Sequence, residues 1–395
     1  MRTYGDLFRV PEFKALFSVV SLQIAASTIS GLALGVLVYT ATSSPLLSAL
    51  SMFGPSFAQM IGALALLSAA DRLPPRAAMI ALALTFALGT AAVAIPGLPV
   101  WAIFAIIFLL GLAASIGGGV RFGLLNEILP KDGYLLGRST INMSVGIQQI
   151  VGYAIGGLLV TFLAPALTLL TGASLYLLAA ATARLGLTAR PPRATGRPSI
   201  PETWRTNRVL WSSGSHRSLY LALWVPNGLI VGCESLFVAF DPAHAGVLFA
   251  FAAFGMLLGD IAAGRFLPPH WRVRLGAPLR LLLAIPYLIF FLHPSLPFAV
   301  AAVALASIGF SASLLLQERL LALTPESISG QALGLQSAGL TTMQGVGAAL
   351  AGTIAQLTTP ATAMGVMACA SVIVTLLLAA GLRSAYREVA VTQPG

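Results

Sequence analysis

The chain has 395 residues, of which 57% are hydrophobic and only 9% are charged, and its mean hydropathy is +0.91. Soluble domains carry about 25% charged residues, so this composition excludes a water-soluble globule of this length. The net charge of +10 does not indicate nucleic-acid binding, because the basic residues are spread over loops between apolar segments. Attraction to anionic lipid headgroups explains the charge better.

Twelve apolar stretches follow one another, and each approaches the roughly 20 residues that a helix needs to cross a bilayer. They cover residues 13–40, 46–70, 77–95, 101–120, 139–163, 165–183, 218–240, 243–263, 276–293, 297–317, 331–358 and 361–382. Every second connection is short and contains no Lys or Arg, and most of these hold a proline, which ends a helix. All 22 basic residues lie on the other side.

Cytoplasmic loops of membrane proteins keep an excess of Lys and Arg. The pattern therefore predicts an all-α membrane protein with twelve transmembrane helices and both termini in the cytoplasm. Its predicted location is the inner, cytoplasmic membrane. The long, basic, proline-rich connection divides the chain into an N-terminal six-helix bundle (1–187), a linker (188–217) and a C-terminal six-helix bundle (218–395).

The two halves repeat one another. Residues 149–157 in span five match residues 344–352 in span eleven at five of nine positions, with an offset of 195. Three further matches, Pro130 with Pro325, 73–75 with 267–269 and 115–117 with 307–309, occur in order at offsets of 192 to 195. Such a series indicates duplication, with the two bundles related by an axis along the membrane normal.

The chain resembles the major facilitator superfamily, and within it the bacterial twelve-helix exporters of the enterobactin-exporter-like group. The resemblance rests on residues 7–13, 37–39 and 42–46, and on a signature after span two, Gly-x-x-x-Asp-Arg-x-x-Arg-Arg. Asp71, Arg72 and Arg76 match that signature, whereas Leu67 replaces its glycine and Pro75 its first closing arginine. The resemblance implies a secondary transporter in which two bundles alternately expose a central cavity.

The signature also points to gating residues, because an acid that pairs with arginine at an inner helix end braces one conformation. Besides Asp71, Arg72 and Arg76, the candidates are Arg121 at the inner end of span four, Asp260 near the cytoplasmic end of span eight, and Arg265 just after that span. A plain cytoplasmic cap with orienting charges explains these residues as well. In span five, Gly152 to Gly157 stand where exporters carry Gly-Pro-x-x-Gly-Gly, with Tyr153 in place of the proline, which favours a packing role.

Glu234 in span seven is the candidate for proton coupling. Ionisable groups within the hydrocarbon are costly and mark transport pathways, and Glu234 shares a helix face with Asn227, seven residues earlier. A glutamate that reaches the outer interface or bonds to a neighbouring helix is the alternative. The candidate cavity residues are uncharged and polar or aromatic: Gln23, Gln59, Gln148, Gln149, Trp224, Asn227 and Gln344. These suit an amphiphilic, weakly polar cargo, although glutamines also join helices.

No nucleotide-binding signature occurs, and the four histidines are scattered over different loops, so we expect no cofactor and no metal. The expected partners are a small-molecule substrate, protons and the lipid bilayer, without nucleic acid, and the resemblance implies a monomer. Proton-coupled efflux of a small amphiphilic metabolite or drug is the favoured function. Uptake is the alternative within transport, and an intramembrane enzyme or structural subunit is the alternative from another class, although no clustered catalytic set supports an enzyme.

Overall fold

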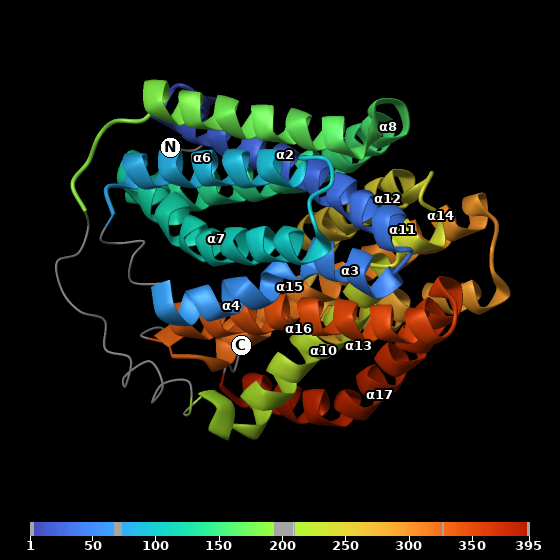
Figure 1. Ribbon diagram of the computed structural model, residues 1–395. Coiled ribbons are helices and arrows are strands. Elements are labelled where there is room, and N and C mark those ends of the chain that lie inside the picture. The colour runs from blue at the N-terminus through green and yellow to red at the C-terminus, as the bar shows by residue number, and fades with distance from the viewer. Residues whose placement is uncertain (1–3, 67–72, 193–207, 209, 326–327, 393–395) are drawn as a thin grey trace. The chain divides into compact units, whose positions relative to one another are not determined.

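The computed structural model describes residues 4–66, 73–192, 208, 210–325 and 328–392, and the regular secondary structure in these ranges is all helical (Figure 1). The first half contains α1 (Tyr4–Phe8), α2 (Pro11–Thr42), α3 (Pro45–Phe53), α4 (Pro55–Leu66), α6 (Pro75–Val93), α7 (Val100–Ile128) and α8 (Lys131–Gly186). The second half contains α10 (Gly214–Glu234), α11 (Phe237–Phe240), α12 (Ala245–Ile261), α13 (Pro269–Ala284), α14 (Leu296–Ile308), α15 (Ala312–Leu323), α16 (Ser329–Leu357) and α17 (Pro360–Thr392).

Shorter helical turns join some of these helices. A π-helical turn, Ala262–Phe266, follows α12, and 3-10 turns, Ile285–Leu292 and Gly309–Ser311, follow α13 and α14. Nine helical stretches of the described residues are long and apolar enough to cross a membrane. The twelve-span count and the cytoplasmic termini stay predictions.

The predicted turns without basic residues coincide with breaks in the helices. At the first, Ser43 is left-handed (φ 52°) and closes α2, and Pro45 begins α3. At the third, α8 continues as one 56-residue element, but Ala164 is non-helical (φ 67°, ψ 156°) immediately before Pro165. Proline cannot continue a regular helix, and it disfavours helical geometry in the residue before it. The sequence therefore located this reversal, and α8 holds predicted spans five and six.

The helices form two compact units that do not follow the two halves of the sequence strictly. Unit 1 comprises Met1–Ser43, Gly54–Arg197 and Pro242–Ala250, and unit 2 comprises Ser44–Phe53, Pro198–Asp241 and Phe251–Gly395. In unit 1, α2 and α6 pack on α8, and α4 packs on α7; in unit 2, α10 packs on α16 and α17, and α3 packs on α16. Each unit therefore includes a short segment from the other half of the sequence.

Small residues set the distance between the packed helices. In unit 1, Gly152 lies against Thr28 and Gly156 against Ile29, which joins α8 to α2, while Gly157 lies against Gly246 at the start of α12. This is the packing role that the sequence favoured for the glycines of span five, because small residues let helices approach closely in lipid.

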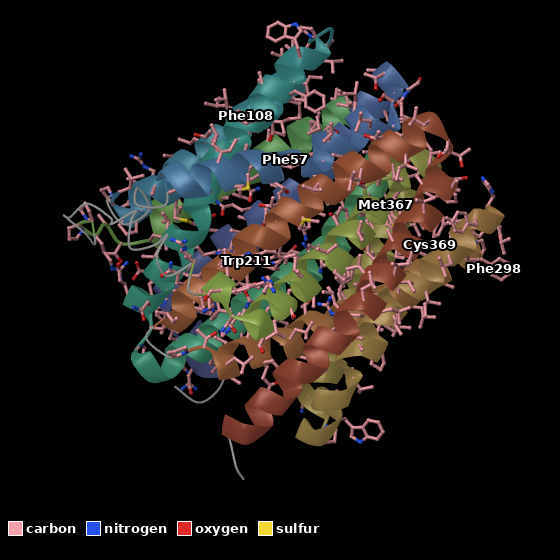
Figure 2. All side chains as sticks on the ribbon, turned by 90° about the horizontal axis from the view of Figure 1, so that it is seen from below. Phe57, Phe108, Trp211, Phe298, Met367 and Cys369 are labelled. Carbon is pink, nitrogen blue, oxygen red and sulfur yellow. The ribbon has the colours of Figure 1, made fainter. Side chains whose placement is uncertain are left out.

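Large apolar side chains remain on the outside, as expected for a surface that meets lipid. Phe108 of α7 is 44% exposed and Phe298 of α14 is 65% exposed, and Figure 2 shows both at the periphery of the helices. Met367 of α17, only 2% exposed, lies among the helices in the same view. Apolar residues therefore occupy both the interior and the surface, which water would not permit to this extent.

Candidate functional site

Glu234 is the last residue of α10 and is buried in unit 2. It is 7% exposed, and its Oε1 has no hydrogen-bond partner among the described residues. The next residue, Ser235, donates its hydroxyl to the carbonyl of Gly232 at 2.7 Å. Ser235 thus hydrogen-bonds to the end of its own helix, whereas Oε1 of the neighbouring Glu234 carboxyl group has no such partner among the described residues. An ionised carboxylate without hydrogen bonds is costly in such a place.

Asn227 lies on the same face of α10, two turns before Glu234. It is 5% exposed, and its Oδ1 also lacks a hydrogen-bond partner in the described part of the chain. Buried side-chain oxygens are nearly always hydrogen-bonded in proteins, so each exception needs an explanation. Two on one helix face indicate a place where a proton, a water molecule or a ligand atom would supply the missing bonds.

Tyr287, which the sequence analysis did not single out, belongs to the same surroundings. It lies in the turn Ile285–Leu292, is fully buried, and is close to Glu234 and Cys233. Its hydroxyl group has no hydrogen-bond partner among the described residues. A tyrosine within an apolar run was the only signal in the sequence, and nothing there connected span nine with span seven.

Trp224 has a packing environment that the sequence did not predict. Its ring stacks on Tyr220 and on Trp211, with ring centroids 5.1 and 5.6 Å apart, and its Nε1 donates to the carbonyl of Gln336 at 2.9 Å. Tyr220 donates to the carbonyl of Ala332 at 3.2 Å. The three aromatic rings therefore hold the start of α10 against α16.

The glutamines predicted for the cavity are all half-buried. They are divided between the units: Gln23, Gln59, Gln148 and Gln149 belong to unit 1, and Gln344 belongs to unit 2 with Trp224, Asn227 and Glu234. Their role in binding stays a prediction.

The predicted gating residues have different surroundings. Asp71 and Arg72 lie outside the described residues. Arg76 donates from Nη2 to the carbonyl of Arg184 at 2.5 Å, and so caps the end of α8. Asp260 and Arg265 are exposed, and within the described ranges no ion pair joins them. Arg121 lies over the ring of Phe122.

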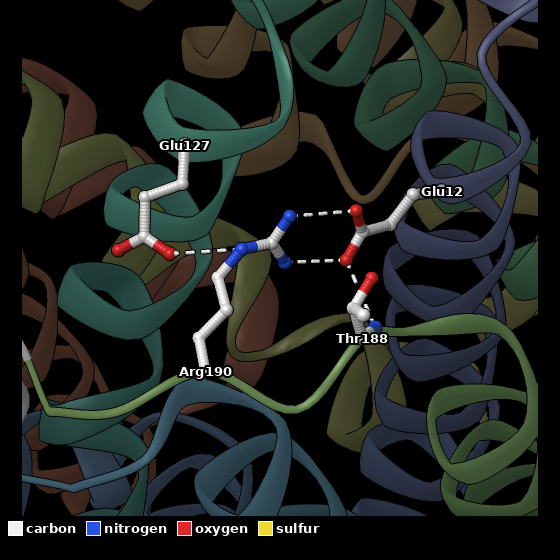
Figure 3. A network of polar contacts seen from close by, with 4 residues as sticks. All are labelled: Glu12, Glu127, Thr188 and Arg190. Carbon is white, nitrogen blue, oxygen red and sulfur yellow. Dashed lines mark hydrogen bonds and ion pairs between the residues drawn. The ribbon is translucent and has the colours of Figure 1, made fainter.

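A different ionic cluster, absent from the predicted set, ties three segments of unit 1 together (Figure 3). Arg190, just after α8, donates two hydrogen bonds to Glu12 at the start of α2, one of them at 2.7 Å, and its Nε lies 3.4 Å from Glu127 near the end of α7. The backbone N–H of Thr188 also donates to Glu12, at 2.9 Å. Sequence separation hid this cluster, because its members come from three distant segments.

Glu12 stabilises the charged form of Arg190. Its hydrogen bonds and negative charge raise the pKa of Arg190 above the usual arginine value, even though partial burial acts in the opposite direction. Arg190 therefore stays charged at every physiological pH. The arrangement is a two-pronged arginine–carboxylate contact, which fixes orientation as well as distance.

Several arginines modify the expectation that basic residues keep to the loops. Arg121, Arg138, Arg280 and Arg319 lie inside helical stretches that are long enough to cross a membrane. Arg280 is 2% exposed and Arg319 is 7% exposed. The described helices extend further than the predicted spans, so residues that the sequence placed at or beyond the span ends fall within them.

No protein-family model matches the chain, and no curated protein matches its sequence. Solved structures do match. A POT family transporter in complex with a thioalcohol-conjugated peptide matches with a TM-score of 0.75 and 12% identity, covering 94% of this chain and 96% of that chain. A bacterial homolog of the human lysosomal transporter Spinster, inward-facing and unoccupied, matches with a TM-score of 0.72 and 15% identity, covering 97% and 98%.

The nucleoside transporter NupG matches with a TM-score of 0.80 and 13% identity, covering 94% of this chain and 99% of that chain. Identities this low carry the fold and not the substrate. Because these matches extend over nearly the full length of both chains, the chain has the fold that these transporter structures share.

Proposed function

We propose that this protein is a secondary active transporter that moves a small amphiphilic metabolite or drug by alternating access, with proton-coupled efflux as its direction. The fold supports transport, because the matched structures are named as transporters. The observation that carries the proton coupling is Glu234, a buried carboxyl group in α10 with an unsatisfied oxygen among the described residues.

Proton coupling follows from the cost of a buried charge. A carboxyl group in an apolar environment is more stable when it is protonated, and access to water on one side of the membrane lets it release the proton. A protein that exposes Glu234 alternately to the two sides would therefore carry a proton with each cycle. Tyr287 is the polar neighbour that would stabilise the ionised form.

The proposed topology has twelve spans in two six-helix bundles, 1–187 and 218–395, joined by the linker 188–217. Both termini are in the cytoplasm and the monomer lies in the inner membrane. The one-sided distribution of Lys and Arg supports this orientation. Uptake coupled to protons is the alternative direction. An intramembrane enzyme or structural subunit is the alternative from another class, whereas the matched structures are named as transporters.

The test is proton movement in proteoliposomes that contain a trapped pH-sensitive dye. A panel of amphiphilic cations, neutral compounds and anions is added under an imposed pH gradient, and dye and compound are followed together. We expect Glu234→Gln to lower gradient-driven transport by at least about tenfold, because an amide cannot bind and release the proton. Asp6→Asn, which removes a carboxylate near the N-terminus, is the matched control and should transport normally.

The outcomes separate the parts of the proposal. Gradient-driven transport of unchanged pH dependence in Glu234→Gln would remove that residue from the coupling mechanism. Export is supported if the compound accumulates inside the vesicles only when the cytoplasmic side of the protein faces the outer solution, and if protons move in the opposite direction. Movement of compound and protons together in one direction supports uptake instead.

A further inference from the structure

Two arginines from different helices of unit 1 share one aromatic ring. The guanidinium carbon of Arg121, in α7, lies 4.7 Å from the centre of the Phe122 ring, and that of Arg138, in α8, lies 5.0 Å from it. Cations bind the faces of aromatic rings, and arginine does so with its planar group. The ring thus brings two like charges together, although their mutual repulsion opposes this arrangement.

The two arginines also lie at similar distances from the ends of their helices. Arg121 precedes the end of α7, at Ile128, by seven residues, and Arg138 follows the start of α8, at Lys131, by seven residues. With a rise of 1.5 Å per residue, each lies about 10 Å from its helix end. Both positions fall within stretches that are apolar enough to cross a membrane. A charge within an apolar helical stretch is costly unless something neutralises it.

Within the described residues, no carboxylate neutralises either guanidinium. No ion pair of Arg121 or Arg138 is found there, and Nε of Arg121 is buried without a hydrogen-bond partner. Glu127, which is also on α7, contacts Arg190 instead. The pair therefore presents N–H donors at one level, and a carboxylate or a phosphate is the group that such donors bind in two-pronged fashion.

The face of α8 that carries Arg138 includes further polar residues. Asn142 and Gln149 follow at spacings of four and eleven residues, which returns to nearly the same helix face. Met143, Ile147 and Val151 are 45%, 45% and 42% exposed, and they form a separate apolar stripe that begins about 140° further around the helix. Arg138 and Asn142 are themselves exposed, and exposed polar groups suit a water-filled or ligand-filled space better than hydrocarbon.

We propose that Arg121 and Arg138, positioned by Phe122, bind the carboxylate or phosphate group of an amphiphilic ligand, whose remaining part extends along Asn142 and Gln149. The proposal rests on the transport function proposed above and narrows it, because the cargo then carries an anionic end. Lipid headgroups and free anionic compounds share this chemistry.

Binding to the full-length protein in nanodiscs of zwitterionic phosphatidylcholine tests the site. The probes are octyl phosphate and octanoate, with octyltrimethylammonium as the cation of equal chain length, and the dissociation constant is measured for each. We expect the anions to bind more tightly than the cation. Their binding should weaken by at least about tenfold in Arg121→Gln and in Arg138→Gln, because each loses a charged pair of donors.

Two controls protect this comparison. Arg9→Gln removes a guanidinium whose side chain is 86% exposed, and it should bind like the original protein. Arg138→Lys keeps the charge without the planar fork and should retain part of the affinity. Melting temperatures of all variants show that the protein is folded. Equal anion affinity in the original protein and in the double variant Arg121→Gln/Arg138→Gln, or no preference for anions over the cation, would overturn the proposal.

A second set of nanodiscs that contains phosphatidylglycerol identifies the source of the anionic group. Weaker octyl phosphate binding there, seen only when both arginines are present, assigns the site to a lipid headgroup; unchanged binding assigns it to a free ligand. Both results support an anion site. Anion binding that persists in a protein without transport contradicts the proposed function alone, whereas transport with no effect of either arginine on anion binding contradicts this inference alone.

Discussion

Each unit contains one copy of the same crossing of two helices, but the two helices approach each other more closely in unit 2 than in unit 1. The repeated segments 149–157 and 344–352 supply it, so Gly152 and Gly347 are corresponding residues. In unit 1, Gly152 of α8 faces Thr28 of α2, and an added Cβ would lie 2.9 Å from the Cβ of Thr28. In unit 2, an added Cβ on Gly347 of α16 would overlap the backbone carbonyl of Gly228 in α10.

The comparison shows which features the two repeated segments share and which differ between them. Both copies kept a small residue where span five meets span one and where span eleven meets span seven. The first crossing accommodates the side chain of a threonine, whereas the second has glycine on both helices, Gly228 and Gly347, and brings their backbones together. A side chain can move aside and a helix backbone cannot, so we expect the second crossing to be less tolerant.

The largest effect is expected for Gly347→Ala. Its methyl group would require α10 and α16 to separate, so we expect a loss of more than about 3 kcal/mol in the free energy of unfolding, because overpacking against backbone exceeds the usual 1–3 kcal/mol. Gly152→Ala, the corresponding change in unit 1, should cost about 1–3 kcal/mol, since Thr28 takes up part of the strain. Thermal unfolding in detergent, followed by size-exclusion fluorescence, measures both.

Gly334→Ala is the matched control on the same helix as Gly347. Nothing lies within 4 Å of the added Cβ at that position, and alanine favours helix over glycine by about 1 kcal/mol, so this variant should be as stable as the original protein or more so. If Gly152→Ala and Gly347→Ala were equally harmful, the proposed difference between the two crossings would be wrong.

The starts of the two corresponding helices, α2 and α10, are also held differently. Glu12 at the start of α2 is held by Arg190, whereas the start of α10 is held by the stacked rings of Trp211, Tyr220 and Trp224. An ion pair weakens as salt is added, and an aromatic stack does not. Salt dependence is therefore the property that distinguishes the two anchors.

Arg190→Gln should have the intermediate effect. Loss of the contacts with Glu12 and Glu127 is expected to lower the free energy of unfolding by about 1–2 kcal/mol at low salt, and by less at 1 M salt, since the cluster is partly exposed. The raised pKa of Arg190 means that its contribution is lost only when the pH rises through that pKa, so it should not change between about pH 7 and 9. Unfolding at two salt concentrations measures this.

The control for Arg190→Gln is Arg9→Gln, which breaks the exposed ion pair with Asp6 and should change stability by less than about 0.5 kcal/mol. A double-mutant cycle of Glu12→Gln with Arg190→Gln isolates the pair itself. A coupling energy near zero would show that the contact is a surface pair without structural effect.

The smallest effect is expected for Tyr220→Phe. The ring and its stacking remain, and only the hydrogen bond from the hydroxyl group to the carbonyl of Ala332 is removed. The loss should be about 1 kcal/mol and independent of salt. A marked salt dependence in this variant would contradict the distinction between an ionic anchor in unit 1 and an aromatic one in unit 2.

The sequence predicted the helical class and the reversals well, because these depend on local properties. Apolar length indicates a span, and prolines such as Pro45 and Pro165 mark where a helix must end. It also found the repeated glycine segment, and it selected Glu234 because an acid within an apolar run is rare. Burial of Glu234 agrees with that choice, while its function in coupling stays a prediction.

Contacts between distant segments could not be predicted in this way. The sequence repeat indicates that residues 149–157 and 344–352 are related. Only the tertiary structure determines that one copy contacts Thr28 and the other contacts Gly228. The same holds for Arg190 with Glu12, for Tyr287 beside Glu234, and for the two arginines on Phe122. The sequence by itself determined where the chain crosses from helix to turn, because hydropathy and proline act within a few residues. Which faces of those helices meet depends on packing between segments up to hundreds of residues apart, and only the fold determines that.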